Sequence, residues 1–191
     1  MDTYLDNIDV AKLDSIMHNT SVNVNYFNDT CDRIVSSYTE GLDNLMKDIY
    51  VECVKADNPT MNVMQKYYLE LTNMIYFMVE KLEKLGVYSD MSLSASKEVY
   101  SKSYLKQSML KDANGKSKST VAELQAQANM DAQYETVVSS IYERAYKIVK
   151  GKISSAQDMA DSLKRILYTM TTEMSLSMSS SSYQNDFRGD R

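Results

Sequence analysis

The strongest constraint on the fold is a stretch in which apolar residues recur at alternating spacings of three and four. It runs from Met64 to Leu85 and follows Pro59, the one proline of the chain. This spacing places the apolar side chains on one stripe of an α-helix and is typical of helices that pack as coiled coils. The same spacing recurs from Tyr134 to Ile148. The positions of the first stretch are Met64, Tyr67, Leu71, Met74, Met78, Leu82 and Leu85.

Residues that favour tight turns are scarce in the rest of the chain. Five glycines and one proline among 191 residues argue against an all-β fold, which needs many turns. The 14 methionines and 15 tyrosines supply adaptable apolar and amphipathic surface for packing. We therefore predict an all-α fold of elongated helical hairpins with coiled-coil-like packing, in a protein that self-associates.

The apolar periodicity and the cap signals divide the chain into expected helices. A short helix is predicted over 8–17 and a long one over 27–53. Asn58-Pro59 then provides an N-cap and a proline at the first helical position, and this helix is expected to end at Gly86. A link over 88–94 leads to the next helix, 97–112.

The second half of the chain is expected to form a helical hairpin. Thr120-Val-Ala-Glu123 has the pattern of a capping box and predicts a helix start after the lysine-rich loop. The helix through Tyr134 is expected to end at Gly151, and Ser154 or Ser155 to cap a last helix that ends near 170. The polar, serine-rich remainder predicts a flexible tail.

Charge separates the chain into parts more clearly than composition does. Residues 1–57 contain eleven acidic and four basic residues, whereas 97–118 contain six lysines and two acids. We predict an acidic N-terminal helical segment (1–57), a helical core (58–170) with a basic helix and loop (97–118), and the flexible tail (171–191). Such asymmetry suggests different partners for the acidic and basic parts.

The motifs for catalysis or metal binding are incomplete. Gly115-Lys116-Ser117 has the last letters of a P-loop, but Leu110 stands where the first glycine is required and no strand pattern precedes it. His18 is the single histidine, and the cysteines have no metal-ligand spacing. We therefore expect no enzyme activity and no cofactor or metal, and Cys31 and Cys53 are predicted to be buried thiols.

No apolar run approaches the roughly 20 residues that are needed to cross a bilayer, and no secretory signal is recognisable. We therefore expect a soluble, cytoplasmic protein without a membrane partner.

The basic helix 97–112 interleaves lysines with tyrosines. Lysines neutralise phosphates and tyrosine rings stack on bases without reading sequence, so this pattern is typical of single-stranded nucleic-acid binding. The alternative interpretation is that the tyrosines border the core and the lysines are solvated. The candidate binding residues are Lys97, Tyr100, Lys102, Tyr104, Lys106, Lys111, Lys116 and Lys118.

The order of segments from 97 to 167 resembles the UvsY-type recombination mediators of bacteriophages. A basic helix (Lys102-Ser-Tyr-Leu-Lys106) and a Gly-Lys loop precede a helix through Asp131-Ala-Gln-Tyr134. This helix ends in a short basic turn, Lys150-Gly-Lys152, and a Gln157-Asp-Met159 start to the final helix follows. The resemblance covers a little over a third of the chain.

This resemblance implies a specific function. Members of the family are non-enzymatic helical proteins that form rings, bind single-stranded DNA and help a RecA-like recombinase replace the single-strand-binding protein. In the family pattern Lys-x-Arg-Leu contacts DNA; here Lys102 and Leu105 match, and Tyr104 stands where arginine is expected. The resemblance thus implies single-stranded DNA, a recombinase, a single-strand-binding protein and a second copy of the chain as partners, in the cytoplasm of an infected bacterial host cell.

Two alternatives remain open from the sequence. A phage virion structural or adaptor protein would act only through helical protein-protein interfaces built from the methionine-rich and tyrosine-rich faces. A helical regulatory protein would act through partner helices alone. Both predict assembly with other proteins and no salt-sensitive affinity for DNA.

Overall fold

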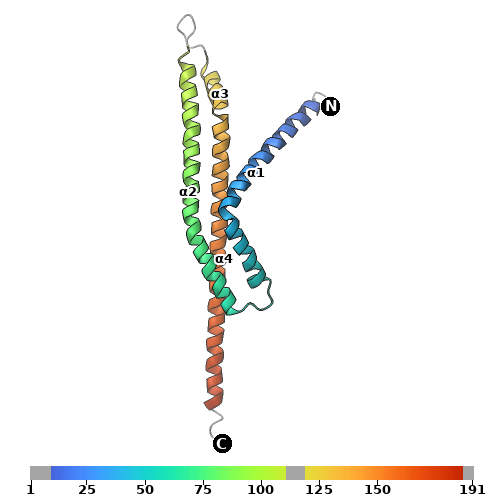
Figure 1. The fold of residues 1–191 in the computed structure, drawn as a ribbon, viewed down its shortest axis with the longest axis vertical. Coiled ribbons are helices and arrows are strands. Elements are labelled where there is room, and N and C mark those ends of the chain that lie inside the picture. The colour runs from blue at the N-terminus through green and yellow to red at the C-terminus, as the bar shows by residue number, and fades with distance from the viewer. Residues whose placement is uncertain (1–9, 111–118, 187–191) are drawn as a thin grey trace, which may run out of the picture. The chain divides into compact units, whose positions relative to one another are not determined.

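The computed structural model describes residues 10–110 and 119–186, and the side chains of 24–110 and 119–176 (Figure 1). All regular elements in this part of the chain are helical, which confirms the all-α prediction. The elements in chain order are α1 (Val10–Ile49), the π-helix η1 (Tyr50–Val54), α2 (Met61–Ser108), α3 (Val121–Asp131) and α4 (Gln133–Asp186).

Helix α1 is one continuous helix where two were predicted. The segment between the expected helices contains neither glycine nor proline, so nothing in its backbone interrupts the i to i−4 hydrogen bonds. At its end the chain widens into the π-helix η1, where the Lys55 N–H donates to the Tyr50 carbonyl at 2.9 Å. This geometry keeps both Ile49 and Cys53 buried. The second cysteine, Cys31, is also a buried free thiol, as predicted.

Helix α2 begins later and ends later than expected. Its N-cap is Thr60 rather than Asn58, because the Val63 N–H donates to the Thr60 hydroxyl at 3.4 Å. The helix then continues through Gly86 and through the predicted link at 88–94 as far as Ser108. The predicted apolar stripe is confirmed by the buried side chains of Met64, Leu71, Met78, Leu82 and Leu85.

The stripe on α2 also continues beyond Gly86, but with serines in place of large apolar residues. Ser96 and Ser103, seven residues apart, are both buried and each makes a hydrogen bond to another helix. The heptad spacing therefore persists while its chemistry changes from apolar contacts to hydrogen bonds.

Helix α3 starts at the predicted capping box. The Thr120 hydroxyl accepts from the Glu123 N–H at 3.3 Å, and the Glu123 carboxylate accepts from the Thr120 N–H at 2.7 Å. The helix ends at Ala132, whose N–H donates to the Ala128 carbonyl at 3.0 Å. Helix α4 starts at the next residue.

The predicted hairpin after Gly151 is wrong, and the backbone of the predicted tail is helical as far as Asp186. Helix α4 runs through Gly151, through Ser154 and Ser155, and on to Asp186. One glycine within a helix costs only about 1 kcal/mol relative to alanine, which the packing of α4 on both sides overrides. Tyr134, which the apolar spacing places on the inner stripe of its helix, is exposed.

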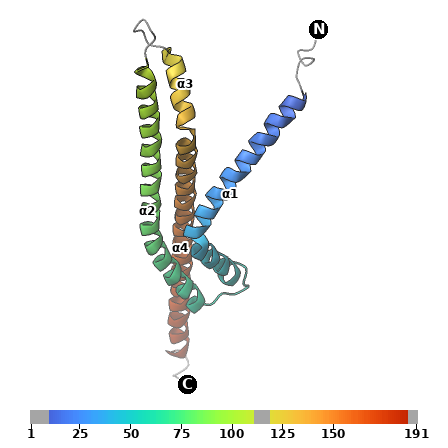
Figure 2. The ribbon, with the colours of Figure 1, turned by 45° about the horizontal axis from the view of Figure 1, so that its top comes forward.

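The chain divides into two compact units, each built from separate segments of the helices. Unit 1 comprises Met1–Ser37 and Leu85–Lys147. In it, the second half of α2 lies side by side with α3 and the start of α4, in antiparallel directions (Figures 1 and 2). The Ser96 and Thr136 hydroxyls lie 2.9 Å apart, and the Ser103 hydroxyl donates to the Asp131 carboxylate at 2.5 Å. These polar contacts fix how the two antiparallel helical segments align along their length.

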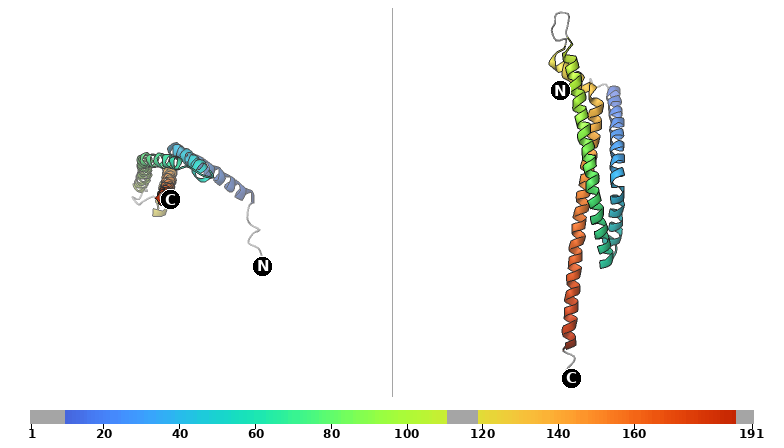
Figure 3. Two further views of the ribbon diagram at one scale, coloured as in Figure 1. Left: turned by 90° about the horizontal axis from the view of Figure 1, so that it is seen from below. Right: turned by 60° about the vertical axis from the view of Figure 1, so that its left-hand side comes forward.

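Unit 2 comprises Tyr38–Lys84 and Ile148–Arg191. The end of α1, the first half of α2 and the second half of α4 pack around a core of large apolar side chains. On its C-terminal side, α4 continues beyond the connection between α1 and α2 (Figure 3). The fully buried core side chains of this unit are Leu42, Ile49, Leu71, Met78, Val149 and Leu163.

Candidate nucleic-acid interface

The predicted basic helix is the last part of α2 in unit 1. Successive residues of a helix are rotated by about 100°, so Lys97, Tyr100 and Tyr104 share one side, whereas Lys102 lies on a different side. The Tyr100 and Tyr104 rings are stacked, with centroids 6.3 Å apart and an angle of 20° between their planes. The structure therefore brings together three of the predicted residues.

Lys97 and Tyr100 line a shallow groove between α2 and the α3–α4 junction. The groove has a volume of about 340 Å³ and is closed on the α2 side by Ser96 and Ser101. Asn129, Ala132 and Thr136 form its other side. The groove thus combines a cation, an aromatic ring and a side-chain amide, which are groups that phosphates and bases bind.

Lys102 and Lys106 lie outside this groove. Lys102 forms an ion pair with Glu98 one turn earlier in the helix, and the hydrogen bond and the charge of this lysine lower the pKa of Glu98. Lys106 is exposed, and its charge helps to lower the pKa of Asp131, after hydrogen bonds from Ser103 and Gln127. Both ammonium groups therefore have a carboxylate in their surroundings.

The loop lysines of the prediction lie outside the described residues. Lys111, Lys116 and Lys118 fall within 111–118, which joins α2 to α3. His18 lies in α1, in the part where only the backbone is described.

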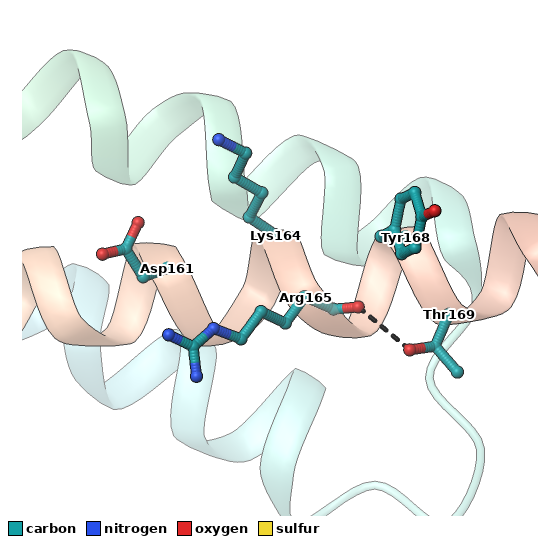
Figure 4. Close-up of a pocket in the computed structure, with 5 residues that line it drawn as sticks. All are labelled: Asp161, Lys164, Arg165, Tyr168 and Thr169. Atoms are coloured by element: carbon teal, nitrogen blue, oxygen red, sulfur yellow. Dashed lines mark hydrogen bonds between the residues drawn. The ribbon is translucent and has the colours of Figure 1, made fainter.

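A second group of basic and aromatic residues, which the sequence reasoning missed, lies on α4 in unit 2. Lys164, Arg165 and Tyr168 surround a surface hollow together with Asp161 and Thr169 (Figure 4). The Thr169 hydroxyl donates to the Arg165 carbonyl at 3.2 Å, and the Tyr168 side chain is 75% exposed. In both places a basic residue precedes a tyrosine by three positions: Arg165 and Tyr168 on α4, and Lys97 and Tyr100 on α2. This shared spacing is the sequence signal that could have indicated the group on α4.

The α4 hollow differs from the groove on α2 in two respects. All its lining residues come from one helix, so no second wall encloses a ligand. It also includes Asp161, a carboxylate that repels phosphate. We therefore rank the α4 hollow behind the groove as a nucleic-acid site.

A third surface feature is an apolar hollow of about 540 Å³ between α1 and α4 in unit 1. The Arg144 guanidinium lies over the Phe27 ring, 5.9 Å from its centroid. Val24, Tyr26 and Val137 add apolar surface to the lining, and Asn28 and Gln133 add side-chain amides. The hollow thus combines apolar surface with one cation and two amides.

Several other features restrict the chemistry of the described residues. Among the side chains that the structure describes, those of 24–110 and 119–176, no three or more His, Cys, Asp or Glu gather as they would around a metal ion. No helix in these ranges has a stretch long and apolar enough to span a membrane. Burial raises the pKa of the Cys31 and Cys53 thiols, which disfavours their reactive thiolate forms.

The comparisons with known proteins give no relative. No protein-family model, curated protein or solved structure matches the chain.

Proposed function

We propose that the protein is a non-enzymatic, single-stranded DNA-binding protein of the recombination-mediator kind, which assists the loading of a RecA-like recombinase. The observation that carries the proposal is that Lys97 and Tyr100 line the groove between α2 and the α3–α4 junction, with the Tyr104 ring stacked on that of Tyr100. Lysine offers charge to a phosphate and the tyrosine rings offer faces to the bases, whatever their sequence.

The order of the chain supports the same proposal. The groove helix leads directly into the loop with Lys111, Lys116 and Lys118, so these cations follow the groove along the chain. The resemblance of 97–167 to UvsY-type mediators rests on the same basic helix and loop. A single subunit with these few cations binds DNA weakly, and assembly of several subunits would raise the affinity through effective concentration.

Fluorescence anisotropy of a labelled single-stranded oligonucleotide tests the proposal. The titration is made at low and at moderate salt, with a duplex of the same sequence as control. We expect binding that prefers the single strand and weakens as salt rises, since phosphate contacts release counterions. Absence of binding at protein concentrations where assembly is demonstrated by light scattering would refute the proposal.

The virion structural or adaptor function is the second candidate, and exposed apolar side chains favour it. On α2 in unit 2, Tyr76 and Phe77 are both exposed and contact each other edge to face, with centroids 5.5 Å apart. Leu69, Tyr168 and Leu176 are also exposed in this unit. Exposed apolar side chains in such numbers suit protein-protein contacts. Assembly without salt-sensitive DNA binding would support this candidate over the first.

A further inference from the structure

Two hydrogen bonds between helices hold the walls of the groove in unit 1. The Ser96 and Thr136 hydroxyls lie 2.9 Å apart, and the Ser103 hydroxyl donates to the Asp131 carboxylate at 2.5 Å. Along α2 these bonds lie about one turn before and one turn after Tyr100, which lines the groove. Both walls are therefore fixed at two levels, so a ligand does not have to order them when it binds.

The polar side chains of the groove differ in whether they are free to bind a ligand. The Ser96 and Thr136 hydroxyls bond each other, and Thr136 also donates to the Ala132 carbonyl at 2.8 Å. Asn129 on α3 is exposed, and its amide makes no hydrogen bond to any residue that the structure describes. This amide is therefore available to a ligand, from the wall opposite Tyr100.

The wall on α2 supplies the groups for the phosphate and for the face of the base. Lys97 and Ser101 both line the groove, are exposed and lie one helical turn apart, so an ammonium and a hydroxyl stand close to each other. Both are donors that bind phosphate oxygens. The Tyr100 ring, stacked on that of Tyr104, supplies an aromatic face. The edge of a base stacked there is left to the opposite wall.

A side-chain amide can pair with the Watson–Crick edge of every base. It presents an acceptor, its oxygen, beside a donor, its NH₂ group. Each of the four bases likewise presents a donor next to an acceptor on this edge, and the amide matches either order when it turns over. Proteins recognise single strands in this way, by stacking on a base and hydrogen bonding to its edge. In a duplex the same edge is occupied by the complementary base.

We propose that the groove seats one nucleotide, with its phosphate at Lys97, its base on the Tyr100 ring and the Watson–Crick edge of the base paired with the Asn129 amide. Asn129 is then the residue that keeps binding independent of base identity and that favours single strands over duplex. The groove volume of about 340 Å³ suits a single nucleotide. This inference rests on the proposed binding of single-stranded DNA.

The variant Asn129→Asp tests the role of the amide, because a carboxylate is a pure acceptor. Guanine alone presents two adjacent donors, N1–H and the N2 amino group, on its Watson–Crick edge. The variant should therefore lose affinity for most single strands, because its charge repels phosphates, and should retain affinity best where guanine is present. The matched control is Gln125→Asp, which adds the same charge one turn earlier on α3, at an exposed position outside the groove lining.

Fluorescence anisotropy is measured with three labelled single strands: all-dT, alternating dA–dC and alternating dG–dT. Lithium salt is used so that guanine quadruplexes do not form. The original protein should bind the three strands within about twofold of one another. Asn129→Asp should bind the dG–dT strand at least about fivefold more tightly than all-dT, as expected for one matched pair of hydrogen bonds. Gln125→Asp should weaken binding to all three strands alike.

Asn129→Ala removes the amide without adding charge. It should weaken binding to all three strands by a similar factor of about two to ten, the value of one hydrogen bond. Circular dichroism first establishes that each variant keeps the helical content of the original protein.

The outcomes separate this inference from the proposed function. If the original protein binds none of the strands, the proposed function itself fails and the inference falls with it. If the original protein binds but Asn129→Asp shows no guanine preference, or Gln125→Asp shows the same preference, the role of Asn129 is overturned while DNA binding stands. Unchanged binding by Asn129→Ala would overturn it as well.

Discussion

The Lys152 Nζ lies 2.6 Å from the Asp43 Oδ2 and joins α4 to α1 within unit 2. The two residues are 109 positions apart in the chain, and the pair is only partly exposed. Partial burial by itself would raise the pKa of Asp43, but the hydrogen bonds from Lys152 and Thr39 and the charge of Lys152 outweigh it and lower the pKa below its ordinary value of 3.8.

Replacing Lys152 by methionine should destabilise the protein by about 1 kcal/mol at neutral pH, because a partly buried carboxylate loses its cation. A carboxyl group whose pKa is lowered by folding stabilises the fold above its ordinary pKa, and this contribution is lost as pH falls through the lowered value. The difference between Lys152→Met and the original protein should therefore shrink below about pH 4. Urea denaturation at several pH values measures it, and Lys150→Met, at an exposed position nearby, should show no comparable effect.

Replacement by alanine is expected to change the stability of the protein differently at two of the helical glycines. Gly151→Ala should stabilise the protein by about 0.5–1 kcal/mol, because alanine is the better helix former and its methyl group meets no neighbour. Gly86→Ala should give no such gain, because the new methyl group would press on the Tyr146 ring. Thermal unfolding followed by circular dichroism compares the two, and an equal gain from both would contradict the close approach at Gly86.

The buried Ser96 on α2 contributes through its hydrogen bond to Thr136. Ser96→Ala should cost about 0.5–1.5 kcal/mol, the usual net value of one hydrogen bond. Thr136 keeps a second partner, since its hydroxyl also donates to the Ala132 carbonyl at 2.8 Å, so no buried group is left unpaired. Chemical denaturation checks this, with Ser94→Ala at an exposed position of α2 as control. A loss much above this range would mean that the serine does more than bond Thr136.

The capping box at α3 has a simple test in two variants. Thr120→Ala removes the acceptor for the Glu123 N–H and should cost about 1 kcal/mol, whereas Thr120→Ser retains the oxygen and should be close to neutral. Hydrogen exchange of the first turn of α3 should accelerate in the alanine variant alone. Equal exchange in the two variants would show that the cap does not hold this turn.

Features that depend on local sequence could be predicted. The apolar stripe from Met64 to Leu85 and the Thr120–Glu123 capping box are set by residues within a few turns of each other, and both are found in the structure. The burial of Cys31 and Cys53 followed from their places in an apolar helical pattern.

Features that depend on distant partners could not be predicted in the same way. The burial of Ser96 and Ser103 could not be predicted, because their bonding partners, Thr136 and Asp131, lie 40 and 28 positions further along the chain. Gly86 and Gly151 were predicted to end helices. Both helices continue through these glycines because they pack against segments that are distant in the sequence. For the candidate site, helical spacing separated Lys97 from Lys102, but the opposite wall of the groove, with Asn129 and Thr136, required the fold.

The binding face can be tested by a pair of matched double variants, Lys97→Gln/Tyr100→Leu at the groove and Arg165→Gln/Tyr168→Leu on α4. Each double variant removes one cation and one tyrosine ring, and in both the two residues are three positions apart. Circular dichroism first establishes that both retain the helical content of the original protein.

Anisotropy titration of these variants with single-stranded DNA at low salt tests the central claim most directly. The groove variant should bind at least about tenfold more weakly, as expected for a lost base-stacking ring, and its affinity should depend less steeply on salt. The α4 variant should bind like the original protein. Unchanged binding by the groove variant, or an equal loss in both, would contradict the assignment of DNA binding to the groove between α2 and the α3–α4 junction.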